Sequence, residues 1–245
     1  METEEYQNVF DQEKKHWYYV GLRRLIFKFL EKINSDTTEI RALDAGCGTG
    51  GLLEELKGYS ISYGFDISKE AIKYCKLRKL ENVVRGSVEN IPFAENTFNV
   101  VISLDVLYHL QVQNDLLAIK ELYRILHDRG ILIINIAAYN FLRSAHDDVV
   151  HTRHRYTKKE LEKKLCEAGF RIVKLTYRNS ILFPVILIKR IFENLKNKKS
   201  ISDVKPLPRI INFLLIKVLA LENILLQILN FPVGLSIFCI AQKRK

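Results

Sequence analysis

The chain has 245 residues, of which 48% are hydrophobic and 27% are charged. A chain of this length and apolar content can bury a full core as one domain, so disorder is not the default expectation. The formal net charge of +10 favours anionic partners, and nucleic acid, anionic lipid and phosphorylated substrates all qualify.

The four cysteines are far apart in the sequence and form no C-x-x-C pair. No histidine spacing typical of a zinc site accompanies them, so we expect a reduced protein without a bound metal. The first residues, METEEYQNVF, lack the basic and apolar regions of a signal peptide. We therefore expect a cytoplasmic protein, with the cytoplasmic face of a membrane as a second expected location.

An amphipathic segment at 16–33 precedes short apolar runs that alternate with helical patterns. This alternation predicts parallel strands joined by right-handed crossovers, with helices on both faces of the sheet. Ser68 and Asn114 are predicted N-caps of two crossover helices, and Gly130 is predicted to end the second. The five predicted strands lie at 40–46, 61–68, 82–87, 98–104 and 130–137.

The pattern continues with a predicted helix from Thr157 to Ala168, a Gly169 C-cap and a sixth strand from Phe170 to Tyr177. The last apolar run predicts a closing strand, and the connection to it is far longer than a hairpin needs. We therefore expect three parts: an N-terminal helical cap at 1–36, a core at 37–179 and 234–245, and a helical insertion at 180–233.

The insertion contains two very apolar segments, 180–192 and 207–231, with the basic run ENLKNKKS between them. Lys217 and Glu222 interrupt the second segment, so a transmembrane helix of about 20 apolar residues is not expected. Two interpretations stay open. The helices lie in a membrane interface, anchored by lysines, or they pack on the sheet or form a homodimer interface.

A glycine turn follows the first predicted strand. Gly46, Gly48 and Gly51 have the G-x-G-x-x-G spacing of a dinucleotide site, and Asp66 follows where a ribose-binding acid would stand. Glycines at such a turn let the backbone approach a ligand closely, and the next helix offers free amides. These features alone predict an adenosine-containing cofactor and do not say which one.

Asp44, two residues before this turn, distinguishes the cofactors. Its carboxylate would repel the pyrophosphate of NAD, whereas it would pair favourably with the α-ammonium group of S-adenosylmethionine. We therefore predict that Asp44 and the turn Gly46–Gly50 hold the methionine end of S-adenosylmethionine. Asp66 is then the acceptor for both ribose hydroxyls.

Four segments together resemble the class I S-adenosylmethionine-dependent methyltransferases: LDAGCGTG, YGFDIS, RGSVENIPFAENTFNVVISLDVLYHL and LYRILHDRGILIIN. The resemblance implies a three-layer Rossmann-like α/β fold. Its seven-stranded sheet is mostly parallel, and the last strand lies antiparallel between the fifth and sixth. The expected cofactor-binding residues are Asp44, Gly46, Cys47, Gly48, Gly50, Asp66, Ile67, Ser87, Val88, Leu104 and His109.

The chain departs from the family pattern at three places. Ser87 replaces an aspartate that often binds the adenine amino group, but its hydroxyl, or the backbone amide of Val88, can serve instead. Tyr108 replaces the acid of a common E-H pair, and Asp128 and Arg129 replace a proline and a glycine. None of these changes removes the methionine-end site, so we expect an active protein.

Titratable residues gather in RSAHDDVVHTRHRYTKKEL, between the fifth strand and its helix. This loop is similar to H-D-x-x-x-G-H-x-R-R-Y-[ST] in a type 11-like subgroup of the methyltransferases. The subgroup also has an aromatic H-W-Y helix, as in 16–24, and an N-x-x-x-F-P turn, as in 179–184. The match slips by one residue at His151, so either His151 or His154 takes the functional place. The resemblance implies glycan, polyprenyl-linked or lipid modification.

Our hypothesis for catalysis is that a histidine of this loop, oriented by Asp147, deprotonates an acceptor hydroxyl. Arg155 or Arg153 would bind an anionic group of the substrate. The alternative is a salt-bridged loop that closes over the cofactor, and His109 has its own alternative in helix capping or cofactor packing. The candidate catalytic residues are His146, Asp147, His151, His154, Arg155 and Tyr156.

The predicted function is methyl transfer to a hydroxyl of a small-molecule, glycan or lipid-linked acceptor, with membrane contact through 180–233. An RNA methyltransferase, a quinone or lipid C-methyltransferase and a cofactor-binding scaffold are the alternatives. Nucleic acid is disfavoured, because SLDVLYHL lacks an N-P-P-Y sequence and no added RNA-binding domain is recognisable.

Overall fold

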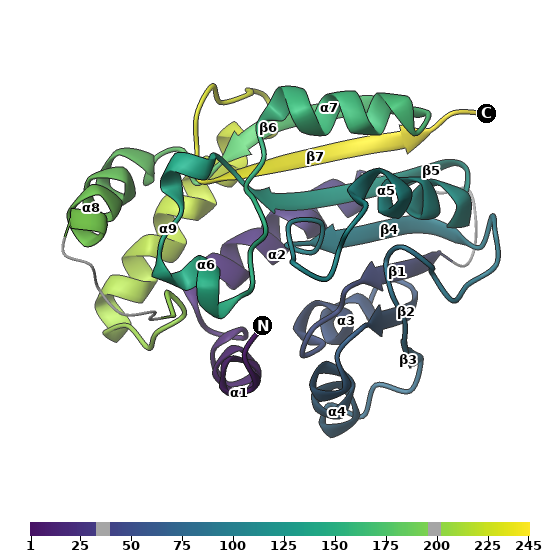
Figure 1. Cartoon of the computed structure of the whole chain (residues 1–245), viewed down its shortest axis with the longest axis horizontal. Coiled ribbons are helices and arrows are strands. Elements are labelled where there is room, and N and C mark those ends of the chain that lie inside the picture. The colour runs from purple at the N-terminus through teal and green to yellow at the C-terminus, as the bar shows by residue number, and fades with distance from the viewer. Residues whose placement is uncertain (33–39, 196–201) are drawn as a thin grey trace.

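The computed structural model describes residues 1–32, 40–195 and 202–245. They form a sheet in the strand order β3-β2-β1-β4-β5-β7-β6 (Figure 1). β7 pairs antiparallel with both β5 and β6, and the other neighbours pair parallel, which confirms the expected fold. The strands are β1 (Arg41–Ala45), β2 (Ile61–Asp66), β3 (Val83–Arg85), β4 (Phe98–Leu104), β5 (Leu126–Ala137), β6 (Phe170–Arg178) and β7 (Ser236–Lys243).

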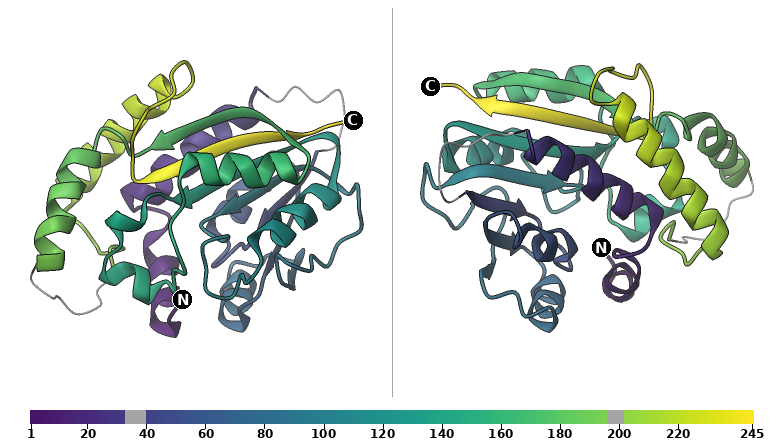
Figure 2. Two further views of the ribbon diagram at one scale, coloured as in Figure 1. Left: turned by 45° about the horizontal axis from the view of Figure 1, so that its top comes forward. Right: turned by 180° about the vertical axis from the view of Figure 1, so that it is seen from behind.

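Helices cover both faces of this sheet. α5 and α7 pack on one face, while α2 and α3 pack on the other (Figures 1 and 2). The helices are α1 (Thr3–Gln12), α2 (Trp17–Leu30), α3 (Gly51–Leu56), α4 (Lys69–Leu77), α5 (Asp115–Ile125), the 3₁₀ turn η1 (Asn140–Leu142), α6 (Ala145–Val149), α7 (Lys158–Glu167), α8 (Phe183–Leu195) and α9 (Arg209–Leu225).

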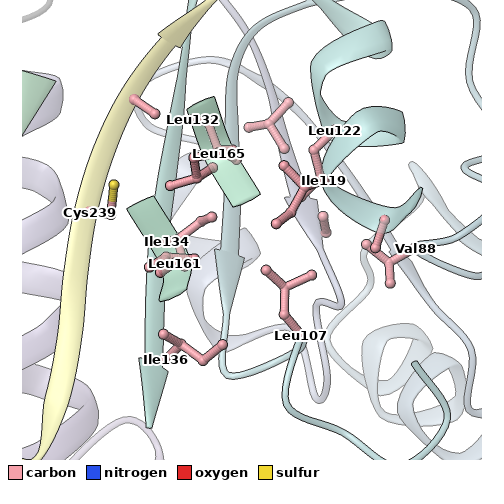
Figure 3. Packing of buried hydrophobic residues seen from close by; sticks show 14 of the residues in the cluster. Val88, Leu107, Ile119, Leu122, Leu132, Ile134, Ile136, Leu161, Leu165 and Cys239 are labelled. Atoms are coloured by element: carbon pink, nitrogen blue, oxygen red, sulfur yellow. The ribbon is translucent and has the colours of Figure 1, made fainter. Parts of the chain in front are cut away.

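The core explains why β5 is an unbroken apolar run. Successive side chains of a strand point to opposite faces, and both faces of this sheet are covered. Leu132, Ile134 and Ile136 therefore pack beneath α5 and α7 (Figure 3). Ile133 points to the opposite face of the sheet and packs in a separate apolar cluster with Leu25 of α2. Each helix layer thus has its own apolar cluster, and the sheet is held from both sides.

Local signals in the sequence explain most of the helix boundaries. The Ser68 side chain accepts a bond from the amide of Ala71, and the Asn114 side chain accepts one from Leu117, so both predicted N-caps are confirmed. Gly169, after α7, has a φ of +100°, as a C-terminal glycine requires.

The prediction that Gly130 ends a helix is wrong. α5 already ends at Ile125, and the next residue, Leu126, pairs with Phe98 of β4. The register then shifts, so that Val100 pairs with Ile131. Gly130 lies in the irregular turn inside β5. A side chain would not fit there, because a Cβ would lie 2.8 Å from the carbonyl oxygen of His127.

The described part of the insertion forms α8 and α9. α9 lies beside α2 on the back of the molecule (Figure 2), where Gly21 leaves room for Leu219 and the Asn223 side chain donates to the Gly21 carbonyl. Among the described residues, no helix is long and apolar enough to cross a membrane. The predicted boundary between residues 36 and 37, and most of the basic run, lie outside the described residues.

Glu222 does not interrupt α9 as an exposed charge. It is fully buried, and its carboxylate accepts bonds from the backbone amides of Asn179, at 2.6 Å, and Ile181, at 2.9 Å. These two amides belong to the turn between β6 and α8. Glu222 therefore fastens α9 to the start of α8.

Candidate functional site

A cavity of about 580 Å³ lies at the carboxyl ends of the parallel strands. This is the edge at which open α/β sheets bind their ligands. All the predicted cofactor-binding residues line the cavity except Gly50. Gly50 instead starts α3 with a φ of +84°, and a Cβ there would lie 2.5 Å from Leu80, so this glycine is needed to fold the turn.

The glycine turn presents bare backbone to the cavity. The amides of Gly46 and Cys47 both donate to the carbonyl of Phe65, which ties the turn to the end of β2. Gly48 has a φ of +53°, and a Cβ built on it would meet no atom within 4 Å. A ligand can therefore approach the backbone here without meeting a side chain.

Asp44, the fourth residue of β1, is 3% exposed. No hydrogen bond to its carboxylate is found among the described residues. Burial, with the nearby charges of Asp66 and Glu13, raises the pKa of Asp44 to about 8. A buried carboxylate without a cationic partner fits the α-ammonium of S-adenosylmethionine, which would supply the missing positive charge.

Asp66 stands at the end of β2 and lines the same cavity. Its two carboxylate oxygens accept bonds from the amides of Ser68 and Gly48, each at 2.9 Å. A carboxylate oxygen can accept more than one bond, so both remain able to receive ribose hydroxyls. Ser87 and Val88 follow β3 and complete this half of the cavity, where an adenine would lie.

The structure corrects the expected role of Asp147. Its carboxylate accepts bonds from Nε and Nη2 of Arg155, at 2.8 and 2.9 Å, and from the amide of Ser144 at the start of α6. Asp147 is 1% exposed, so this is a buried bidentate ion pair. Asp147 therefore fixes the loop through Arg155 and does not orient a histidine.

The histidines of the loop are not brought together. His146 lines the cavity, and its Nδ1 accepts a bond from the amide of Asp203. His151 lies 2.8 Å from the Glu2 carboxylate, and His154 lies 3.0 Å from that of Glu160. Neither His151 nor His154 is among the residues that line the cavity.

Tyr156 and Arg153 are also absent from the cavity lining. Tyr156 is fully buried; its hydroxyl donates to Asp115 and lies 3.3 Å from the carbonyl oxygen of Leu107. Arg153 lies 3.4 Å from Asp115, whereas Arg155 both lines the cavity and holds Asp147. These contacts favour the alternative of a salt-bridged loop for all but His146 and Arg155.

His109 lines the cavity, but its ring is engaged on both sides. Nδ1 accepts a bond from the amide of Gln111, and Nε2 lies 3.0 Å from the Met1 nitrogen. Burial lowers the pKa of His109 to about 4. A neutral ring held in a turn agrees with the capping and packing role.

Three ligand atoms, from Asp115, His154 and Glu160, lie within 4.8 Å of one another outside the cavity. They could share a cation by distance alone. Asp115 already pairs with Lys164, at 3.0 Å, and accepts from Tyr156, so its charge is compensated. These contacts give no reason to assign a metal.

Residues 43–134 match the family model of the methyltransferase domain. This part of the chain is therefore similar to the methyltransferase domain family, and the sheet order is that of the class I fold. S-Adenosylmethionine is the cofactor that this match indicates, and the buried Asp44 and the bare Gly48 agree with it. Its fold agrees with that of an S-adenosylmethionine-dependent methyltransferase of Thermotoga maritima, which has a TM-score of 0.60, 18% identity, and coverage of 98% of this chain and 96% of that one.

Curated relatives match this chain over part of their length. An uncharacterised protein of Methanocaldococcus jannaschii is 32% identical over 62% of this chain and 66% of its own. The Arabidopsis thaliana tRNA (carboxymethyluridine(34)-5-O)-methyltransferase is 37% identical over 45% and 26%, respectively. The cycloartenol-C-24-methyltransferase of the same plant is 28% identical over 50% and 37%. The chain thus spans less than two thirds of each of these relatives.

Sequence reasoning missed several residues that line the cavity. Tyr18 of α2 and Asp105, directly after β4, face each other there, and Asn179 lies at the end of β6. Polar residues at the carboxyl ends of parallel strands are the expected site positions, so Asp105 carried a usable signal. Tyr18 lies in the H-W-Y segment, but it is 87 residues from Asp105 in the sequence, and no feature of the residues around it indicates that the two side chains meet.

Proposed function

We propose that this methyltransferase transfers a methyl group to a hydroxyl of a lipid-linked or similar amphiphilic acceptor at a membrane surface. The observation that carries the proposal is the composition of the cavity. The cavity continues from the cofactor residues to a second half lined by the insertion. Five residues with helical spacing line this half, one directly before α8 and four on it. They are Leu182, Val185, Ile186, Lys189 and Arg190.

The two ends of this helical face differ in chemistry. Leu182, Val185 and Ile186 are apolar and suit a hydrocarbon part of the acceptor, whereas Lys189 and Arg190 are cationic and already pair with Asp203. Leu207 and Leu215, from the segment that contains α9, add to the apolar side. An acceptor with an apolar part matches the apolar end of this face.

When it is bound, S-adenosylmethionine supplies a methyl group on a positively charged sulfur, which is intrinsically reactive. The protein must therefore mainly hold and align the partners and keep water out. Asp44 would hold the ammonium, Asp66 the ribose, and the Val88 amide or Ser87 hydroxyl the adenine. The apolar residues of α8 would orient the acceptor and exclude water.

The surface of the insertion supports docking on a bilayer. Val185 lines the cavity and is also 68% exposed, so the cavity opens beside an apolar surface. This surface, together with a net charge of +10, suits the interface of an anionic membrane. The exposed apolar side chains of α8 and α9 are Val185, Ile188, Ile191, Phe192, Ile210, Ile211, Phe213, Leu214, Leu221 and Ile224.

A tRNA acceptor is the second candidate. It is favoured by the likeness to the Arabidopsis tRNA methyltransferase and by the positive net charge. The likeness to cycloartenol-C-24-methyltransferase favours an apolar acceptor instead. We prefer the amphiphile because a nucleotide is polar and charged and would make few favourable contacts with the apolar half of the cavity.

The acceptor class is tested by incubating the protein with methyl-labelled S-adenosylmethionine and a cell extract, followed by separation into lipid, water-soluble, protein and RNA fractions. Label in the lipid fraction is expected with the native protein and not with Asp44→Asn. Label in the RNA fraction alone would replace the amphiphile by the second candidate.

Membrane docking is tested by sedimentation with vesicles of phosphatidylglycerol and phosphatidylcholine. Replacement of Ile188, Ile191 and Phe192 by serine should reduce the bound fraction severalfold. Leu77→Ser is the matched control, because Leu77 is 62% exposed on the distant helix α4. Binding that is unchanged by the α8 substitutions, or a dimer in place of vesicle binding, would contradict docking through this face.

A further inference from the structure

Asp105 lies in the cavity as the first residue after β4, and its carboxylate is held by two neutral donors. The Tyr18 hydroxyl donates to Oδ2 at 2.9 Å, and Nδ2 of Asn135 donates to Oδ1 at 3.2 Å. Asn135 Nδ2 also lies 3.1 Å from the Tyr18 hydroxyl oxygen, which closes a ring of contacts. We propose that Asp105 is the proton acceptor for the methyl transfer, with Tyr18 and Asn135 as positioning residues; the inference rests on the proposed transfer to a hydroxyl.

The position of Asp105 places it beside the methionine end of the cofactor site. β4 pairs with β1 in a register that sets Ile102 beside Asp44, so both strands end at the same edge. The residue after Asp105, Val106, packs over the glycine turn, because a Cβ on Gly46 would lie 2.3 Å from its Cγ2. Asp105 is therefore adjacent to the part of the turn that would hold the methionine group.

The backbone of Asp105 has an unusual conformation. Its φ is +59°, in the left-handed region that costs energy for a residue other than glycine. The amide of Asp105 donates to the carbonyl of Asn135 at 2.8 Å, which fixes this conformation against β5. The strained backbone turns the carboxylate toward Tyr18 and the cavity, and such strain is typical of functional positions.

The other carboxylates that line the cavity are less suited to accept a proton. Asp147 and Asp203 accept bonds from arginine side chains, which stabilise the charged form, and the pKa of each carboxyl is lowered. Burial raises the pKa of Glu13, but its carboxylate is already held by Arg78 and by the Thr49 hydroxyl. Asp44 and Asp66 are assigned to the cofactor. Glu5 lies on α1, where the hydroxyl of Ser202 and the amide of Asn8 hold it away from the strand ends.

The surroundings of Asp105 suit a base that works near neutral pH. Burial raises its pKa to about 6, against the opposing effects of the Tyr18 and Asn135 hydrogen bonds and of the cations of Arg178 and Arg155. Arg178 of β6 stacks on the Tyr18 ring, with its Cζ 5.2 Å from the ring centroid. Tyr19 and Tyr108 are the other titratable groups that face this site, and burial keeps both protonated.

The balanced step is as follows. The O–H bond of the acceptor breaks, and its proton goes to a carboxylate oxygen of Asp105. The oxygen lone pair forms the new bond to the methyl carbon, and the electrons of the broken carbon–sulfur bond stay on sulfur. The products are a methyl ether, a neutral thioether and a protonated Asp105, which then releases its proton to water.

The first test compares Asp105→Asn with the matched control Asp148→Asn, an exposed aspartate outside the cavity. Both variants should bind S-adenosylmethionine within about threefold of the native affinity by calorimetry. Methyl transfer to the labelled fraction of the cell extract should fall by about 100-fold or more in Asp105→Asn alone, as loss of a general base predicts. Retention of transfer within about threefold would overturn the proposal.

The second test needs no acceptor. In protein labelled with ¹³C at aspartate carboxyl groups, the signal absent from Asp105→Asn should titrate with a pKa of about 6. Tyr18→Phe removes a bond that stabilises the charged form, so it should raise this pKa and shift the acidic limb of the transfer rate to higher pH. A midpoint of about 4, the value of an ordinary aspartate, would overturn the proposal. Label that appears in RNA would refute the lipid acceptor while leaving this titration as an independent result.

Discussion

At the scale of single residues, Asp44 shows how a binding site costs stability. Its carboxylate is buried beside two other acids, Asp66 and Glu13, and among the described residues no donor reaches it. This arrangement is unfavourable until a cation arrives. The residue that distinguishes the cofactor in the sequence is therefore also one that destabilises the empty fold.

Asp44→Asn should weaken S-adenosylmethionine binding by at least about 2 kcal/mol, or ~30-fold, because the α-ammonium would lose its charged partner. Calorimetric titration measures this loss. Asp148→Asn serves as the control, since Asp148 is an exposed residue paired with Arg143. Equal affinity in Asp44→Asn and the native protein would contradict the assignment of Asp44.

The same substitution should stabilise the cofactor-free protein at high pH. The folded-state pKa of Asp44, about 8, exceeds the ordinary value, so the folded state holds a proton that the unfolded state has released. This residue therefore lowers stability as pH rises from about 4 to about 8. Thermal unfolding should show a larger advantage of Asp44→Asn over the native protein at pH 8 than at pH 5. An equal difference at both pH values would count against a raised pKa.

The buried pair of Asp147 and Arg155 leads to a prediction about stability. Asp147→Asn should destabilise the fold by about 3 kcal/mol, because it leaves the Arg155 guanidinium buried without its counter-charge. Asp148→Asn, in an exposed pair, should change stability by less than about 1 kcal/mol. Urea unfolding measures both. Similar losses in the two variants would contradict the structural role of Asp147.

The cofactor residues could be predicted because a glycine turn and the strand ends beside it are local features of the sequence. The side chains that the residues of the histidine loop contact could not be predicted in this way. Asp147 lies at the third position of α6, where it caps the helix and meets Arg155 from a later turn. Which charge such a carboxylate meets depends on how the loop folds back, and the sequence motif does not contain that information.

At the scale of elements, strand patterns were predictable and one helix end was not. The burial of both sheet faces makes each central strand a short apolar run, which marked β1, β2 and β4 plainly. The end of α5 was missed because the polar residues His127, Asp128 and Arg129 suit an exposed last turn of a helix as well as an exposed turn within a strand. Pairing with Phe98 of β4, a tertiary contact, ends the helix before Gly130.

The two charged residues within α9 should behave differently when neutralised. Glu222→Gln should destabilise the protein by about 1–3 kcal/mol, since its buried carboxylate accepts the amides of Asn179 and Ile181. Lys217→Gln should have little effect, because Lys217 is exposed. Chemical denaturation compares them. Equal effects would show that Glu222 does not fasten α9 to the start of α8.

At the scale of the whole molecule, one cavity joins the sheet core to the insertion. The core supplies the residues for the cofactor, and α8 and α9 supply an apolar half and an exposed apolar surface beside it. Under the proposed function, the insertion both contacts the acceptor and aligns it. Its composition was evident in the sequence, but its position over the strand ends was not.

The central claim is that the α8 half of the cavity receives an apolar acceptor. The most direct measurement compares native protein with Ile186→Asp for S-adenosylmethionine affinity and for labelled methyl recovered in the lipid fraction. Ile186 is partly buried and lines the α8 half, so a carboxylate there should repel the acceptor and leave the cofactor site intact. We predict unchanged cofactor affinity and at least a tenfold loss of lipid label. Lipid labelling that survives this substitution, or label found in RNA alone, would contradict the claim.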